Sequence, residues 1–263
     1  MRRDSRANPR AGSATSTSTR WSRARCGSRW SGNPDRGEAL ARELGPRAHF
    51  RAADVMREED IAALVDTACE RFGQLDCLFS NAGAVTPGTL ENVTAGDLDH
   101  AMRLLVGSAL FGIKHAARVM KPRRSGCIIS NSSVAAPRVG QGELLYSCAK
   151  AAVTHLTHLA GVQLGPDGIR VNAISPGAIA TPIFWGGSAR ASTLSDDENQ
   201  RKMARLQQNL AAATPLPRSG LADDIANAAV FLASDEGSFV NCHDLVVDGG
   251  RTWQFHERPR ERG

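Results

Sequence analysis

The sequence is poor in aromatic side chains, which make up 5% of its 263 residues, and it has one tyrosine, Tyr146. It also has no apolar run near the about 20 residues that a membrane-spanning helix needs. Met1-Arg2-Arg3 is not followed by the apolar stretch of a secretory signal. We therefore expect no membrane association and a cytoplasmic protein.

The six cysteines contain no CxxC pair, and three of them lie in segments with the pattern of buried strands or helices. Buried free thiols fit a reducing compartment. His155 and His158 lie three residues apart without a cysteine or carboxylate partner, which favours packing or surface roles. We expect no metal site.

Positive charge is concentrated at the start of the chain. The net charge is +5, but residues 1–32 hold eight Arg and one Asp, so the remainder has 24 basic and 26 acidic residues. A nearly neutral body gives no basic surface for nucleic acid, and we expect no nucleic-acid partner for it.

Residues 1–32 also lack Leu, Ile, Val and Phe, and the first leucine is Leu40. Without apolar periodicity this Arg/Ser-rich segment predicts no folded element. A transit peptide, a disordered basic arm and a shifted reading frame would each explain it. We favour the third, because Arg23 to Ser31 can be back-translated so that a shifted frame encodes a valine-rich strand. The expected organisation is this segment, a domain over 33–250 and a surface tail over 251–263.

From residue 33 onward, strand and helix patterns alternate. Nearly continuous apolar strands between helices are typical of a parallel sheet covered on both faces, which predicts a doubly wound α/β fold. Expected helices span 33–44, 57–73, 95–120, 143–165 and 221–234, expected strands span 48–55, 75–83, 125–133, 169–177 and 243–250, and 186–212 is expected to be a mobile loop containing a helix.

In such sheets ligands bind at the carboxyl ends of the strands. Polar or glycine-bearing groups stand there, directly after the apolar runs. They are Asp54-Val55, Asn81-Ala82-Gly83, Ser132-Ser133 and Pro176-Gly177, and they predict a cleft.

The spacing of Tyr146 and Lys150 is the clearest indication of a catalytic site. Positions i and i+4 share one face of a helix, so these two side chains can lie side by side. A cation near the phenol should lower the pKa of Tyr146 from about 10 and fit it for proton exchange with a substrate oxygen. Ser133, at a strand end facing the same cleft, can hydrogen-bond that oxygen.

These residues give the chain a resemblance to the short-chain dehydrogenase/reductase family, in its form with one Rossmann-type domain. The resemblance covers about residues 33–250. It rests on Asp54-Val55, Asn81-Ala82-Gly83, Ser133, Tyr146-Ser-Cys-Ala-Lys150, Pro176-Gly177 with Thr181, and Val247-Asp248-Gly249-Gly250.

The resemblance implies NAD(P)-dependent interconversion of an alcohol and a carbonyl in a small-molecule substrate. Tyr146 would be the acid/base, Ser133 would position the substrate oxygen, and Lys150 would hold the nicotinamide ribose. The implied cofactor-binding residues, beside Tyr146 and Lys150, are Asp54, Val55, Asn81, Ala82, Gly83, Pro176, Gly177, Ile179 and Thr181. It also implies a homo-oligomer, either a tetramer packed through 95–120 and 143–165 or a dimer, and a substrate loop at 186–212. Nearby Phe184 and Trp185 offer apolar walls.

Two positions depart from the family pattern. Leu105 stands near the place of an asparagine that anchors a water chain in many members, and Ser108 is a possible replacement. The TGxxxGxG loop that approaches the cofactor pyrophosphate is absent. Ser31-Gly32 occupy roughly the place of the residue selecting NAD or NADP, so this preference is unreadable. The alternative function is a catalytically impaired relative that acts as an interaction partner.

Overall fold

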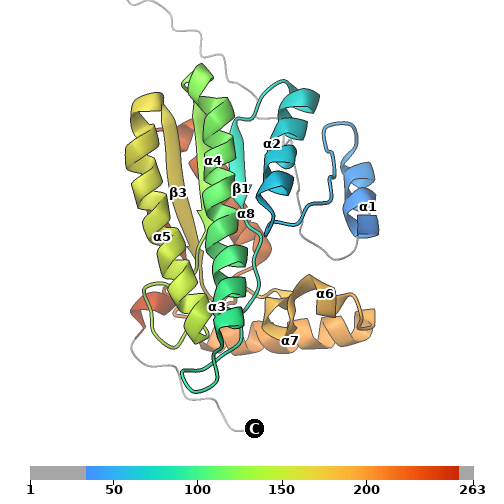
Figure 1. Ribbon diagram of the computed structural model, residues 1–263. Coiled ribbons are helices and arrows are strands. Elements are labelled where there is room, and N and C mark those ends of the chain that lie inside the picture. Colours follow the sequence, from blue (N-terminus) through green and yellow to red (C-terminus); the bar gives the residue numbers. More distant parts are fainter. Residues whose placement is uncertain (1–33, 255–263) are drawn as a thin grey trace, which may run out of the picture.

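The computed structural model describes residues 34–254, except for the side chains of residues 188 and 189. Helices and strands alternate through most of this range (Figure 1). The helices are α1 (Pro34–Leu44), α2 (Glu58–Phe72), α3 (Ala95–Ala101), α4 (Ser108–Met120), α5 (Leu144–Leu164), α6 (Gly187–Ala191), α7 (Asp196–Ala212) and α8 (Ala222–Ala233). The strands are β1 (Cys77–Ser80), β2 (Gly126–Asn131), β3 (Ile169–Pro176) and β4 (Asp244–Val247).

The four strands form one parallel sheet in the order β1-β2-β3-β4. Helices α4 and α5 cover one face and α8 covers the other (Figure 1). One apolar cluster fills the α4/α5 side around Ile128 and Val171, and a second fills the α8 side around Ile129 and Ile174. Both faces are therefore buried, and the doubly wound α/β prediction is confirmed.

The strand expected at 48–55 does not form. This segment has no strand assignment, and β1 is the edge of the sheet within the described residues. A strand needs a hydrogen-bonded neighbour, and none is described for 48–55. Its Phe50 instead packs over α1, where a Cβ on Gly37 would lie only 2.2 Å from the phenyl ring.

The segment 186–212 is more regular than expected, because α6 and α7 occupy most of it. Ser195 accepts a hydrogen bond from the Glu198 backbone N–H, and the Glu198 carboxylate accepts one from the Ser195 N–H. This capping box, with Asp196 and Asp197 in the first turn, stabilises the start of α7. The mobile loop of the prediction is thus largely a capped helix.

The segment 95–120 is helical throughout, as expected, but its middle turn is a π-helix and not an α-helix. Thr94 and Asp97 form the capping box that begins α3, and a π-helical turn, Met102–Gly107, joins α3 to α4. π-Helical turns occur frequently at functional sites. Across residues 34–254, no helix has the length and apolarity to cross a bilayer.

Candidate active site

The end of β2 and the first turns of α5 bring Ser133, Tyr146 and Lys150 together. Between them, the Ser132 hydroxyl donates to the Lys150 carbonyl over 3.1 Å and lies 2.6 Å from the Thr154 hydroxyl. The strand end is therefore attached to two successive turns of α5. This attachment fixes the helical residues relative to the sheet.

The Ser133 Oγ accepts the Ala135 backbone N–H over 3.1 Å. Burial raises the pKa of Tyr146 above its ordinary 10.0, and the nearby Ser133 hydroxyl acts in the opposite direction. The expectation that a neighbouring cation lowers this pKa is wrong in direction. Desolvation outweighs the other effects, because the phenolate loses more hydration on burial than its neighbours return.

Lys150 is a buried amine with 5% of its surface exposed. Its Nζ donates to the Asn131 carbonyl over 2.6 Å and lies 5.5 Å from the centre of the Tyr146 ring. Burial lowers the pKa of Lys150 from 10.5 to about 8. Of the three N–H donors of an ammonium, this carbonyl uses one, so the group can donate to a bound molecule as well.

The end of β1 lies beside Lys150. The Asn131 side-chain N–H donates to Asn81 Oδ1 over 2.7 Å, which joins the ends of β1 and β2. Ala82 follows, and at Gly83 an added Cβ would lie 3.1 Å from Leu105 Cδ2 and 3.8 Å from Lys150 Nζ. A side chain at position 83 would therefore press on Leu105 and touch the lysine amine.

The end of β3 contributes the opposite side of the site. The Pro176 carbonyl accepts the Val134 N–H over 3.1 Å, and a Cβ on Gly177 would lie 2.7 Å from Asp248 Cβ. Ile179 pairs with Gly220 in an isolated bridge, and Thr181 precedes the short helix Pro182–Trp185. The predicted residues of this strand end therefore lie next to the loop that holds Ser133.

Asp54 and Val55 differ in what they contact. The Asp54 carboxylate accepts the Met56 N–H over 2.9 Å, and the Asp54 N–H donates to Asp60, so this residue shapes the turn before α2. Val55 packs against the buried cluster of Leu104, Leu105 and Ala149, which Tyr146 also contacts. Val55 thus shares one cluster with the catalytic candidate.

Sequence reasoning missed Asn131, whose carbonyl anchors Lys150 and whose amide anchors Asn81. A backbone carbonyl leaves no signal in residue type, although the polar run Ser130 to Ser133 after an apolar strand could have drawn attention to the position. The replacement considered at Ser108 gains no support, because that hydroxyl donates to the Leu104 carbonyl over 2.6 Å.

The nicotinamide-ribose part of a dinucleotide fits the residues present. Asn131 Oδ1 is buried without a hydrogen-bond partner in the described part, beside the anchor of Lys150. The buried Lys150 amine lies on the same side, close to Gly83, and can donate to ribose hydroxyls. The predictions made on residues 1–32, including Ser31-Gly32 and the missing glycine loop, lie outside the described residues.

Known proteins with this arrangement are oxidoreductases. The sequence profile described as enoyl-(acyl carrier protein) reductase matches residues 30–252. Momilactone A synthase of Oryza sativa subsp. japonica is 42% identical over 81% of this chain and 76% of its own length. The mitochondrial borneol dehydrogenase of Lavandula x intermedia is 36% identical over 80% and 74%.

Among solved structures, a 7α-hydroxysteroid dehydrogenase in complex with NADH and 7-oxo glycochenodeoxycholic acid superimposes with a TM-score of 0.68. Its sequence is 31% identical, and the match covers 83% of this chain and 81% of that one. Fold and relatives together define a doubly wound NAD(P)-dependent oxidoreductase that interconverts alcohols and carbonyls. The chain belongs to the short-chain dehydrogenase/reductase family. The comparisons give no support to the alternative of an impaired relative.

Proposed function

We propose that Tyr146 is the acid/base of an alcohol–carbonyl interconversion, with Ser133 positioning the substrate oxygen and Lys150 holding the nicotinamide ribose. One observation carries this assignment, the convergence of these side chains on one buried corner. NAD(P), when bound, supplies or accepts the hydride. The Tyr146 hydroxyl gives a proton to the developing alkoxide in reduction and removes the alcohol proton in oxidation.

The protonation state of Tyr146 decides whether the site catalyses reduction or oxidation faster at a given pH. Because burial raises its pKa, the phenol is protonated at neutral pH and is ready to act as an acid. Oxidation requires the phenolate and therefore accelerates as the pH rises. The Ser133 hydroxyl is near enough to the phenol to lower its pKa, so a substrate oxygen placed between the two hydroxyls would receive a hydrogen bond from each.

The residues around this corner form the proposed cofactor site. Gly83 lets Leu105 approach the backbone and Gly177 lets Asp248 approach it, because an added Cβ would lie 3.1 Å and 2.7 Å from these side chains. Lys150 would donate to the ribose hydroxyls. The full set, beside Tyr146 and Lys150, is Asp54, Val55, Asn81, Ala82, Gly83, Pro176, Gly177, Ile179 and Thr181, and the set is open to either NAD or NADP.

An apolar, ring-bearing alcohol or ketone is the proposed substrate class. Phe184 is exposed over 55% of its surface at the entrance to α6, beside Trp185. Two of the relatives are named for borneol and for a hydroxysteroid, both of which are alcohols on ring systems. An apolar wall next to Thr181 suits such a ring.

The proposed catalytic domain spans residues 33–250, which the family match over 30–252 supports. Its proposed setting is the cytoplasm, with no nucleic-acid or membrane partner.

A homotetramer packed through α3–α4 and α5 is proposed, and the exposure of Val162 (70%), Leu159 (52%) and Leu110 (44%) on these helices supports it. Sedimentation velocity tests this assembly directly.

Cofactor titration followed by turnover assays tests the assignment. NADH and NADPH fluorescence should change saturably on adding the folded protein, and a panel of ring-bearing ketones should oxidise the bound cofactor. Tyr146→Phe should retain binding and lose at least about 100-fold in turnover. Cys148→Ser, an exposed change on the same helix, is the control and should leave both unchanged. Absence of saturable binding by either cofactor would overturn the proposal.

A further inference from the structure

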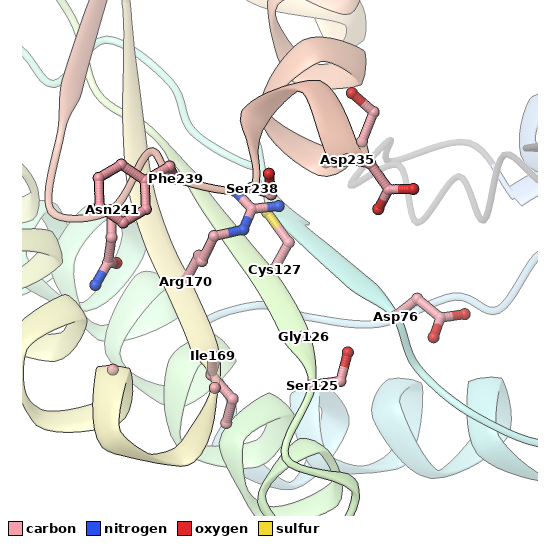
Figure 2. Close-up of a pocket in the computed structure, with 14 residues that line it drawn as sticks. Asp76, Ser125, Gly126, Cys127, Ile169, Arg170, Asp235, Ser238, Phe239 and Asn241 are labelled. Atoms are coloured by element: carbon pink, nitrogen blue, oxygen red, sulfur yellow. The ribbon is translucent and has the colours of Figure 1, made fainter. Parts of the chain in front are cut away.

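A polar cavity opens at the amino-terminal edge of the sheet, opposite the edge that carries Tyr146. Its volume is about 620 Å³. The first residues of β2 and β3 form its floor, and the loop after α8 forms one wall (Figure 2). Phe239, which is fully exposed, stands at its rim. Nothing proposed for the oxidoreductase site uses this cavity.

Two cysteines and an arginine lie in one row across the sheet, and two of them, Cys127 and Arg170, line this cavity. Cys77 on β1 pairs in register with Cys127 on β2, and Cys127 pairs with Arg170 on β3. Residues paired in register in a sheet point to the same face and are nearest neighbours across it. The two thiols are therefore neighbours, and the Arg170 guanidinium lies beside the Cys127 sulfur (Figure 2).

The surroundings of the two thiols differ. The Cys127 S–H donates a hydrogen bond to the Leu232 carbonyl oxygen over 3.3 Å, and Cys127 lines the cavity directly. The neighbouring Cys77 thiol and the charge of Arg170 hold the pKa of Cys127 below its ordinary value, whereas the neighbouring Cys127 raises that of Cys77. A thiolate is the ligand form of cysteine, and of the two sulfurs Cys127 is the one that lines the cavity.

We propose that Cys77 and Cys127 form a dithiol site that binds one thiophilic centre of the trivalent arsenical class. For phenylarsine oxide, the As–O double bond breaks and two As–S bonds form. Both thiol protons leave with the oxygen as one water, so arsenic stays trivalent and no oxidant is needed. The second thiol closes a ring, which a lone cysteine cannot do.

The spacing of the strands favours a bridging atom over a direct disulfide. Neighbouring strands lie about 4.7–4.9 Å apart, whereas the Cβ atoms of a disulfide lie about 3.5–4.5 Å apart. Side chains that point straight from adjacent strands therefore need backbone movement to join sulfur to sulfur. An atom bonded to both sulfurs spans the same gap without that movement.

Intact-mass spectrometry of the full chain after treatment with phenylarsine oxide tests the site. One adduct per chain should survive an excess of 2-mercaptoethanol and be removed by dithiothreitol. The protein holds arsenic in a ring through two sulfurs, and only a competing dithiol can form a ring of its own with that arsenic. Cys77→Ser and Cys127→Ser should each reduce the surviving adduct at least tenfold. Cys148→Ser, which alters an exposed cysteine, should leave it unchanged.

A second variant keeps the test decisive if a serine at position 127 prevents folding. Changing Cys26, Cys69, Cys148 and Cys242 to serine leaves Cys77 and Cys127 as the pair that remains. This protein should retain one adduct when folded and lose the resistance to 2-mercaptoethanol in urea, where the pairing of β1 with β2 is gone. An adduct that the monothiol strips from the folded protein would overturn the proposal.

Discussion

Replacing Lys150 with methionine should remove a pH-dependent component of folding stability. Burial lowers the pKa of this amine to about 8 in the folded chain, against 10.5 when it is exposed. Between these values the unfolded chain binds more protons than the folded chain, so stability rises with pH in this window. Below pH 8 both states are largely protonated, and folding carries the full penalty of burying the cation.

The size of the effect follows from the two pKa values. Integrating the proton difference from pH 8 to pH 10 gives a rise in the free energy of unfolding of about 2 kcal/mol, or roughly 30-fold in the folding equilibrium. The lysine is 5% exposed, so solvent screening does not reduce the estimate. In Lys150→Met the Asn131 carbonyl loses its donor, which costs about 1–3 kcal/mol at every pH.

Urea unfolding of both proteins at pH 8, 9 and 10, at constant ionic strength, measures this difference. Other titrating groups are common to the two proteins and cancel when their stabilities are subtracted. The wild-type advantage should grow by about 2 kcal/mol over this range. A difference that stays flat or shrinks would refute the conclusion that the buried amine loses its proton in the folded state.

Three further predictions concern the surrounding residues. Because Tyr146 is the one tyrosine of the chain, the tyrosinate absorbance of the native protein should titrate with a midpoint above 10, where burial puts it; a midpoint below 10 contradicts the burial argument. Gly177→Ala should cost about 1–3 kcal/mol in urea unfolding, because its Cβ would lie 2.8 Å from Val134, and an unchanged midpoint would mean that the strand end is loose. Thr94→Ala should cost about 1 kcal/mol by losing the capping box with Asp97, whereas Thr94→Ser should retain most of that stability.

The fold could be predicted from the sequence wherever an element carries its own apolar periodicity. Strands β2 and β3 and helices α5 and α8 lie within a few residues of their predicted bounds. The segment 48–55 has the composition of a strand, but strand formation depends on a hydrogen-bonded neighbour and not on composition alone. Likewise, α7 begins at the Ser195 capping box in a segment of mostly charged and polar residues, and the scarcity of apolar residues there led to the prediction of a loop.

The candidate site could be predicted as a set of residue types but not as an electrostatic environment. The spacing of Tyr146 and Lys150 places them on one helix face, and the structure agrees. Burial depends on what packs around that face, which a local pattern does not contain. The predicted lowering of the Tyr146 pKa is therefore wrong. The Leu104 and Leu105 cluster that desolvates this corner comes from another helix, which the local pattern does not contain.

The Asn131 carbonyl that anchors Lys150 has a consequence for how this site can vary. The acceptor is main chain, so any residue type at position 131 would present the same oxygen to the amine. A substitution there can break the link to Asn81 yet leave the lysine anchored. The position of the lysine amine thus depends on the pairing of β2 with β1 and β3, which fixes the Asn131 backbone. Substitutions at position 131 can therefore change the contact between the ends of β1 and β2 while leaving the lysine amine in place.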